Sequence, residues 1–274
     1  MYAFTTTVAL ALVALGFGVG VAGTLVGAGG GFILTPVLLV VYPHDSPQTV
    51  TAISIAVVFF NASSGSIAYA RQRRIDYRSG ILFAVATMPG AVAGALAVDR
   101  VPRGAFDLLM AVLMLAVGVW LIAGSREANR TPGSNGTPRR ILDRRGTESS
   151  YRVPLSRGVM LSAIVGFLSS FLGIGGGIIH VPLLVQLLGF PVHVATATSH
   201  FVLVFMSGTG AVTHLLQGSY RVGDGLRRTL ALSAGVVVGA QLGARISLRT
   251  SGPLIQRLLA VALIGLGVRL AIAF

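Results

Sequence analysis

A run of glycines occurs twice in this chain, each time inside an apolar stretch. The first copy is Gly27-Ala-Gly-Gly-Gly31, followed by Pro36, and the second is Gly173-Ile-Gly-Gly-Gly177, followed by Pro182. Glycine and proline both interrupt helices. Backbone groups cannot stay unpaired in hydrocarbon, where each costs several kcal/mol. Each interruption must therefore be buried in protein or line a hydrated cavity.

The composition places the chain in a membrane. Hydrophobic residues make up 54% of its 274 residues and charged residues 11%, and the mean hydropathy is +0.82. A soluble domain carries roughly 25% charged residues. The basic residues are all arginine and give a net charge of +13. Most of them lie in loops between apolar segments, which favours topology signals over nucleic-acid binding. We expect an all-α polytopic membrane protein that binds no nucleic acid.

The apolar segments form two matching halves. They cover 5–27, 31–42, 49–70, 80–98 and 105–124, and then 158–173, 178–189, 195–217, 227–246 and 254–273. Further matches between the halves are Ser54 with Ser199, Gly65 with Gly210, Tyr69 with His214, Gly90 with Gly235, and Gly94 with Gly239. One structural unit is thus used twice. We expect a first transmembrane repeat at 1–124, a flexible arginine-rich linker at 125–157 and a second repeat at 158–274.

Arginine placement predicts the orientation. The linker and the loop 71–79 are rich in arginine, whereas 43–48 has none, so we expect both basic loops in the cytoplasm and the N-terminus outside. Each half has an odd number of segments, so the second half is expected to cross the membrane in the opposite direction to the first, as in inverted-topology repeats.

Segments 31–42 and 178–189 span roughly 18 Å as helix, less than a bilayer core of about 30 Å. We expect each half to hold a glycine-broken re-entrant or discontinuous helix pair and about three full transmembrane helices.

The glycine runs predict an anion site. Free N–H groups at an unwound stretch and at a helix N-terminus attract negative charge, and glycine lets the backbone approach an oxyanion closely. Tight helix packing is the alternative reason for glycine, but two runs in matched halves favour a site. The predicted substrate contacts come from the two runs and from polar side chains that follow them: Gly29, Gly30, Gly31, Phe32, Thr35, Ser54, Asn61, Gly175, Gly176, Gly177, Ile178, His180, Thr198 and Ser199.

Other kinds of chemistry have less support. Cysteine is absent, which excludes thiolate ligands and thiol catalysis. His180, His200 and His214 lie in apolar segments, but no HExxH pair or nearby carboxylate supports a metal site. The acidic residues all fall in loops or at segment ends, so no carboxylate is placed to bind Na⁺ or relay protons in mid-membrane. We expect neither an enzyme nor a bound cofactor or metal.

The two GxGGG…Pro segments, the second followed by Ala195-Thr-Ala-Thr-Ser199, resemble the TauE/SafE sulfite exporter family. The resemblance covers nearly the whole chain outside the linker. It implies a bacterial plasma-membrane carrier for sulfite or a small organosulfonate. The family pattern implies roles for Gly29–Gly31, Pro36, Gly175–Gly177, Pro182 and the Thr198-Ser199 pair. The first half departs from that pattern, because Thr51-Ala-Ile-Ser54 replaces the Ala-Thr-Ser form.

We expect export by alternating access, because an inside-negative potential drives an anion outward and the predicted site lacks a carboxylate for ion coupling. The substrate would be sulfite or an organosulfonate such as sulfoacetate. Two alternatives stay open, namely ion-coupled uptake of a sulfur oxyanion such as thiosulfate and a membrane-embedded, histidine-based metal protein. The expected partners are a small anionic substrate and membrane lipid, and association into a homo-oligomer is left open.

Overall fold

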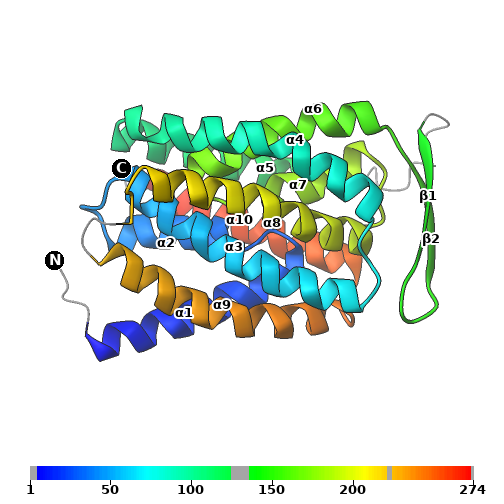
Figure 1. Ribbon diagram of the computed structural model, residues 1–274, viewed down its shortest axis with the longest axis horizontal. Coiled ribbons are helices and arrows are strands. Elements are labelled where there is room, and N and C mark those ends of the chain that lie inside the picture. The colour runs from blue at the N-terminus through cyan, green and yellow to red at the C-terminus, as the bar shows by residue number, and fades with distance from the viewer. Residues whose placement is uncertain (1–4, 125–135, 221–223, 273–274) are drawn as a thin grey trace.

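The computed structural model describes residues 5–124, 136–220 and 224–272 (Figure 1). Their helices, in chain order, are α1 Thr6–Val26, α2 Gly31–Val41, α3 Pro47–Arg71, α4 Tyr77–Ala97, η1 Val98–Arg100, α5 Arg103–Gly124, α6 Leu155–Leu172, α7 Gly177–Pro182, η2 Leu183–Leu187, α8 Val192–Leu216, α9 Gly225–Ser247 and α10 Gly252–Ile272. In this described part, eight helices are long and apolar enough to cross a membrane. The expected all-α polytopic membrane fold is confirmed.

The helices pack in pairs, and each pair contains one helix from each half of the chain. Helix α1 packs along α9, and the equivalent helix α6 packs along α4. Helix α3 packs on its own equivalent, α8, and α5 packs on α10. The matched glycines make the first two contacts close: a Cβ on Gly90 would overlap the carbonyl of Ala163, and one on Gly235 would overlap that of Val13. Gly90 and Gly235 therefore serve helix packing.

Equivalent helices of the two halves run in opposite directions along the bundle. Helix α3 begins near the C-terminus of α8, where the Tyr220 hydroxyl donates to the Ala52 carbonyl at 3.0 Å. Beyond the C-terminal end of α3, the Asp76 amide donates to the Thr198 hydroxyl in the first part of α8, also at 3.0 Å. Inverted insertion across a membrane stays a prediction, which these directions support.

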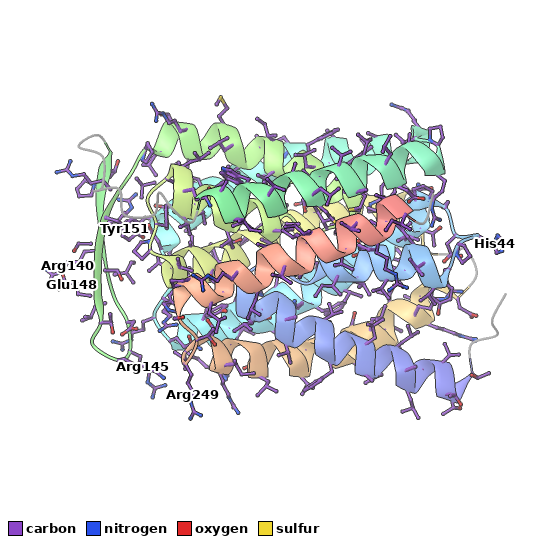
Figure 2. The ribbon with its side chains drawn as sticks, turned by 180° about the vertical axis from the view of Figure 1, so that it is seen from behind. His44, Arg140, Arg145, Glu148, Tyr151 and Arg249 are labelled. Carbon is purple, nitrogen blue, oxygen red and sulfur yellow. The ribbon has the colours of Figure 1, made fainter. Side chains whose placement is uncertain are left out.

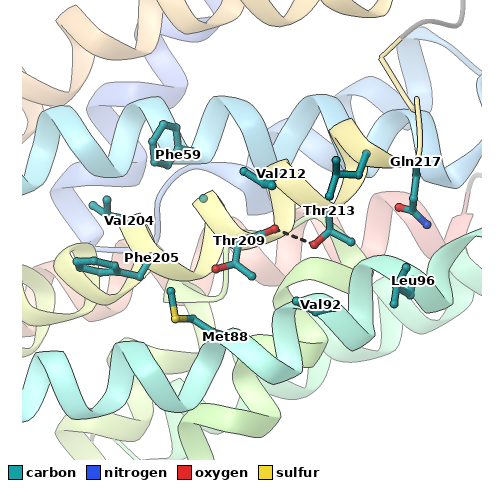
Figure 3. A pocket seen from close by; sticks show the side chains of 12 residues that line it. Phe59, Met88, Val92, Leu96, Val204, Phe205, Thr209, Val212, Thr213 and Gln217 are labelled. Atoms are coloured by element: carbon teal, nitrogen blue, oxygen red, sulfur yellow. Dashed lines mark hydrogen bonds between the residues drawn. The ribbon is translucent and has the colours of Figure 1, made fainter.

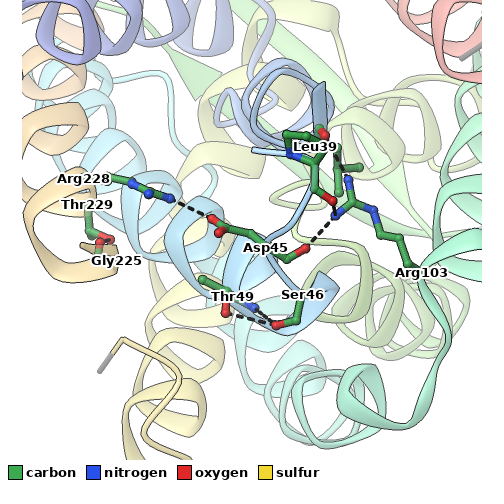
Figure 4. A network of polar contacts seen from close by, with 9 residues as sticks. Leu39, Asp45, Ser46, Thr49, Arg103, Gly225, Arg228 and Thr229 are labelled. Atoms are coloured by element: carbon green, nitrogen blue, oxygen red, sulfur yellow. Dashed lines mark hydrogen bonds and ion pairs between the residues drawn. The ribbon is translucent and has the colours of Figure 1, made fainter. Parts of the chain in front are cut away.

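One end of the bundle is organised around Asp45, in the loop between α2 and α3; we call it the Asp45 end (Figure 4). The Arg228 guanidinium, at the start of α9, pairs with the Asp45 carboxylate at 2.7 Å. Arg103, at the start of α5, donates to the carbonyls of Leu39 at 2.9 Å and of Asp45 at 2.6 Å. A cation at the C-terminus of α2 complements the helix dipole. These contacts hold the short helix α2 at this end.

The opposite end carries a β-hairpin in the predicted linker, and we call it the hairpin end (Figure 1). Strand β1 Thr137–Leu142 pairs antiparallel with β2 Glu148–Val153. Tyr151 and Val153 are buried, and the Tyr151 ring packs 4.8 Å from that of Phe190 between centroids. The expectation of a flexible tether is therefore wrong over 137–153, because apolar residues alternate along β2 and dock on the helix ends. Linker residues 125–135 lie outside the described residues.

The hairpin is tied to the bundle by a buried carboxylate. The Tyr151 hydroxyl donates to Asp76 Oδ2 at 2.9 Å, and Arg139 Nε lies 3.5 Å from the same oxygen. Burial and the Asp76 carboxylate both raise the pKa of Tyr151, so its hydroxyl remains a donor at neutral pH. Asp76 also caps α4 by accepting from the Ser79 amide at 3.1 Å. One carboxylate thus joins the hairpin to the start of α4.

Tyr151→Phe is expected to loosen the hairpin. The change removes a hydrogen bond to a buried charge, worth about 1.5 kcal/mol, while Ser79 and Arg139 still contact Asp76. That energy corresponds to roughly tenfold faster cleavage by trypsin at the hairpin arginines in purified protein. Ser150→Ala, on the exposed face of the same strand, is the matched control. Equal cleavage rates in the two variants would contradict this attachment.

Candidate functional site

Both glycine runs break the chain between a long helix and a short one. Helix α1 ends at Val26 and α2 begins at Gly31, and α6 ends at Leu172 and α7 begins at Gly177. The same positions are left-handed in each run, with φ of 79°, 78° and 82° at Gly27, Gly29 and Gly30, and 70°, 78° and 61° at Gly173, Gly175 and Gly176. Non-glycine residues rarely adopt this conformation. The two runs therefore follow one backbone path.

The two breaks meet in the bundle interior. We call residues 27–32 the first glycine corner and residues 173–178 the second; all are buried. A Cβ on Gly31 would lie 2.6 Å from the carbonyl carbon of Ile174, and one on Gly177 would lie 2.5 Å from the Ala28 Cα. The corners therefore touch backbone to backbone, and the predicted site glycines are brought together.

Several amides at the corners have no acceptor. Within the described chain, nothing accepts from the amides of Gly30, Gly31 and Phe32, or from those of Gly176 and Ile178. Buried backbone N–H groups are nearly always paired in folded proteins. A cluster of unpaired amides at two helix starts is an arrangement that can bind an anion.

The matched serines bind the carbonyl at the opposite corner. The Ser54 hydroxyl donates to the Gly173 carbonyl at 2.7 Å, and the Ser199 hydroxyl donates to the Gly27 carbonyl at 3.2 Å. Thr35 also contacts the Gly173 carbonyl, at 2.7 Å. Thr35, Ser54 and Ser199 thus lie at the corners, where their hydroxyls satisfy backbone oxygens.

The first corner has a polar network that the second lacks. Asn61 Nδ2 donates to the Gly29 carbonyl at 2.8 Å, and the Thr24 hydroxyl donates to Asn61 Oδ1 at 2.9 Å. The position equivalent to Asn61 in the second half is Met206, whose side chain reaches Gly176. Asn61 therefore closes the first corner internally, and the second corner has no such amide.

Two serines at the end of α6, just before the second corner, were missed by sequence reasoning. Ser169 and Ser170 are fully buried, and their hydroxyls have no hydrogen-bond partner. A Cβ on Gly176 would lie 3.0 Å from Ser169 Oγ, so this hydroxyl faces the glycine run. The signal was available, because Ser170 precedes the second run as Thr24 precedes the first. The Ser169 hydroxyl thus adds a donor beside the unpaired amides, whereas the Ser170 hydroxyl lies against Gly210 of α8.

Two predicted residues contact other parts of the bundle. The Thr198 hydroxyl accepts from the Asp76 amide at the hairpin end. His180 Nε2 lies 3.4 Å from Ser162 Oγ, and its ring packs edge-on against Phe83. His200 instead lies against the first corner, with Nε2 3.2 Å from the Thr24 hydroxyl. Over the described residues, no three histidine or acidic side chains form a group that could hold a metal ion.

An apolar pocket lies elsewhere, on the side of the bundle. Its volume is about 870 Å³, and it opens between α3, α4 and α8 (Figure 3). Apolar side chains such as Phe59, Met88 and Phe205 line it, and Thr209, Thr213 and Gln217 are its main polar residues. None of the predicted substrate contacts borders it. Its lining suits hydrocarbon rather than an anion.

Comparison with known proteins agrees with this architecture. Residues 12–270 match the family described as Sulfite exporter TauE/SafE. The "Probable membrane transporter protein YunE" of Bacillus subtilis is 30% identical over 265 residues, which cover 94% of this chain and 96% of that protein. A probable membrane transporter protein of Methanocaldococcus jannaschii is 25% identical over 250 residues, covering 88% of this chain and 86% of that protein. No solved structure gives a significant match. The chain belongs to the TauE/SafE sulfite exporter family of membrane proteins.

Proposed function

We propose that the protein exports a small sulfur-containing anion, sulfite or an organosulfonate such as sulfoacetate. The observation that carries this proposal is the pair of glycine corners, where buried amides have no acceptor. An anion would satisfy these amides, and the partial positive charge at two helix starts would favour it. The Ser169 hydroxyl would add a neutral donor at the second corner. The family description supports sulfite as a candidate substrate.

The direction of transport follows from the membrane potential. A monoanion that leaves a cell with an inside-negative potential of 100 mV gains about 2.3 kcal/mol. Export therefore needs no coupled ion. The acidic residues of the described chain lie toward the two ends of the bundle, as Asp45 and Asp76 do, and not at the glycine corners. A site built from amides and hydroxyls suits potential-driven export.

Substrate access would require the corners to separate. In this structure they touch backbone to backbone and are buried, so an anion has no room between them. Alternating access would open the contact first toward one end of the bundle and then toward the other. The re-entrant pairs would be the moving parts.

We propose that the hairpin end faces the cytoplasm. The start of α1 and the end of α10 would then both lie outside the cell. At the Asp45 end, Arg228 and Arg103 pair with carboxylates, Arg228 with Asp45 and Arg103 with Asp107. The hairpin end carries many more arginines, among them Arg71, Arg73, Arg78, Arg144, Arg145, Arg245 and Arg249. An excess of arginine marks the cytoplasmic side. For a bacterial protein, the membrane would be the plasma membrane.

Transport by purified protein in liposomes tests the proposal. Sulfite or sulfoacetate trapped inside should leave faster than from protein-free liposomes, and an inside-negative potential should speed its exit. No acceleration for sulfite, sulfoacetate, taurine or thiosulfate would overturn the proposal. Accumulation of thiosulfate that stops when a proton gradient is collapsed would instead support ion-coupled uptake.

A further inference from the structure

A polar pocket lies at the hairpin end, away from the glycine corners. Its volume is about 570 Å³, and it lies between the C-terminal end of α3 and the turn of the hairpin. Arg71, Arg73 and Arg144 line it, with Leu142, Asp143 and Gly146. Figure 2 shows further arginines, Arg145 and Arg249, at this same end. The pocket is therefore set in basic surroundings.

Backbone contacts fix the arginines around the pocket. Arg73 has a φ of 56°, a turn conformation uncommon for a residue with a side chain, and its amide donates to the Ala70 carbonyl at 3.0 Å. The Arg144 amide donates to the Gln72 carbonyl at 3.0 Å, which joins the hairpin turn to the end of α3. The three arginines are thus brought together by two segments far apart in sequence.

The single carboxylate of the pocket is already engaged. Asp143 Oδ2 accepts from Arg74 NH2 at 3.4 Å, and Oδ1 accepts from the amides of Arg145 at 2.8 Å and Thr147 at 2.9 Å. Burial alone would raise the pKa of Asp143, but these amides and the Arg74 guanidinium lower it below its usual range.

The pocket therefore keeps an excess of positive charge. Elsewhere in the described residues, no carboxylate pairs with the guanidinium groups of Arg71, Arg73 or Arg144. Three guanidinium groups that have no paired carboxylate and line one cavity favour the binding of a multiply charged anion.

We propose that Arg71, Arg73 and Arg144 bind a phosphate-type oxyanion at the hairpin end. Guanidinium groups present paired N–H donors that match the oxygens of phosphate. The oxyanion can come from the headgroup of an anionic phospholipid or from a free phosphorylated solute. Leu142, which is 58% exposed at the pocket, offers apolar contact to the first of these. This site is separate from the transport site and does not depend on the proposed substrate.

Binding is tested on the purified full chain by thermal unfolding in neutral detergent. One arm adds inorganic phosphate, and the other adds phosphatidylglycerol or, as a reference, phosphatidylcholine, each dispersed in mixed micelles with the detergent. A ligand that binds the folded state raises the unfolding temperature as its concentration rises. We expect a shift with phosphate, phosphatidylglycerol or both, and a smaller shift at high salt. A response to phosphatidylglycerol alone assigns the lipid headgroup as the source, and a response to phosphate alone assigns a free solute.

Two variants attribute the shift to the pocket. The double variant Arg71→Gln with Arg144→Gln should weaken binding by roughly tenfold, because two exposed charge pairs are lost. Arg140→Gln is the control, since Arg140 is an exposed arginine of the same hairpin that pairs with Glu148 and does not line the pocket. A shift caused by sulfite at the glycine corners should persist in the double variant. The proposal is overturned if neither ligand gives a shift, or if the double variant responds like Arg140→Gln.

Discussion

Gly31→Ala is expected to lower the free energy of unfolding by about 3 kcal/mol and to abolish transport. The new Cβ would lie 2.6 Å from the carbonyl carbon of Ile174 and 2.7 Å from the carbonyl oxygen of Gly173. These are backbone atoms, so no rotation of a side chain can relieve the overlap. The two glycine corners must move apart, and overpacking of this kind costs up to about 3 kcal/mol. Thermal unfolding in detergent and efflux from liposomes measure the two effects.

The chain offers a matched control and a second test of the same contact. Gly18 lies in α1 with nothing within 4 Å of an added Cβ, so Gly18→Ala is expected to be neutral or to add up to about 1 kcal/mol through helix propensity. Gly177→Ala, at the equivalent position of the second run, would meet the Ala28 Cα at 2.5 Å and should reproduce the loss. If Gly31→Ala is as stable as Gly18→Ala, the corners are not in close contact.

Asn61→Met is expected to lower the free energy of unfolding by about 3 kcal/mol. It copies the residue at the equivalent position of the second half, Met206, into the first. The Gly29 carbonyl would lose its donor at 2.8 Å, and the Thr24 hydroxyl would lose its acceptor at 2.9 Å. A buried carbonyl left without a donor costs about 1–3 kcal/mol, and the Thr24 hydroxyl would keep only its contact with His200 Nε2 at 3.2 Å. Thermal unfolding reports the loss.

The control for Asn61→Met is Met206→Leu, at the equivalent position of the second half. Leucine is close to methionine in volume and removes no hydrogen bond, so we expect a loss under about 1.5 kcal/mol. A similar loss in both variants would mean that Asn61 acts by filling space and not through its amide. A larger loss in Asn61→Met supports the asymmetry between the two corners.

Much of the architecture could be predicted from local features of the sequence. Long apolar segments predicted the membrane helices, and the breaks were expected at the glycine runs, where α2 and α7 begin at Gly31 and Gly177. The repeated motif indicated the family that the comparison then showed. These features could be predicted because the length of an apolar segment and the position of its helix-breaking residues determine structure within a few helical turns.

Other contacts depend on partners distant in the sequence. The Thr198 hydroxyl was expected at the substrate site but accepts from Asp76, 122 positions away. The residues 137–153 were expected to be flexible, yet Tyr151 reaches Asp76, 75 positions away, and docks the hairpin. A side chain's direction on a long membrane helix follows from which helices pack beside it, and a helix that is apolar on every side does not indicate which face will be buried.

Composition and helix breakers act locally, so the amino-acid sequence is enough to predict a membrane protein with two similar halves, each broken by glycine. Contacts between distant segments bring the two breaks together, let Asn61 close one corner while the unpartnered Ser169 hydroxyl faces the other, and form the arginine pocket at the hairpin. Those arrangements form only when segments from both halves pack together. The hydrogen bond from the Thr35 hydroxyl to the Gly173 carbonyl, for example, joins residues 138 positions apart in the sequence.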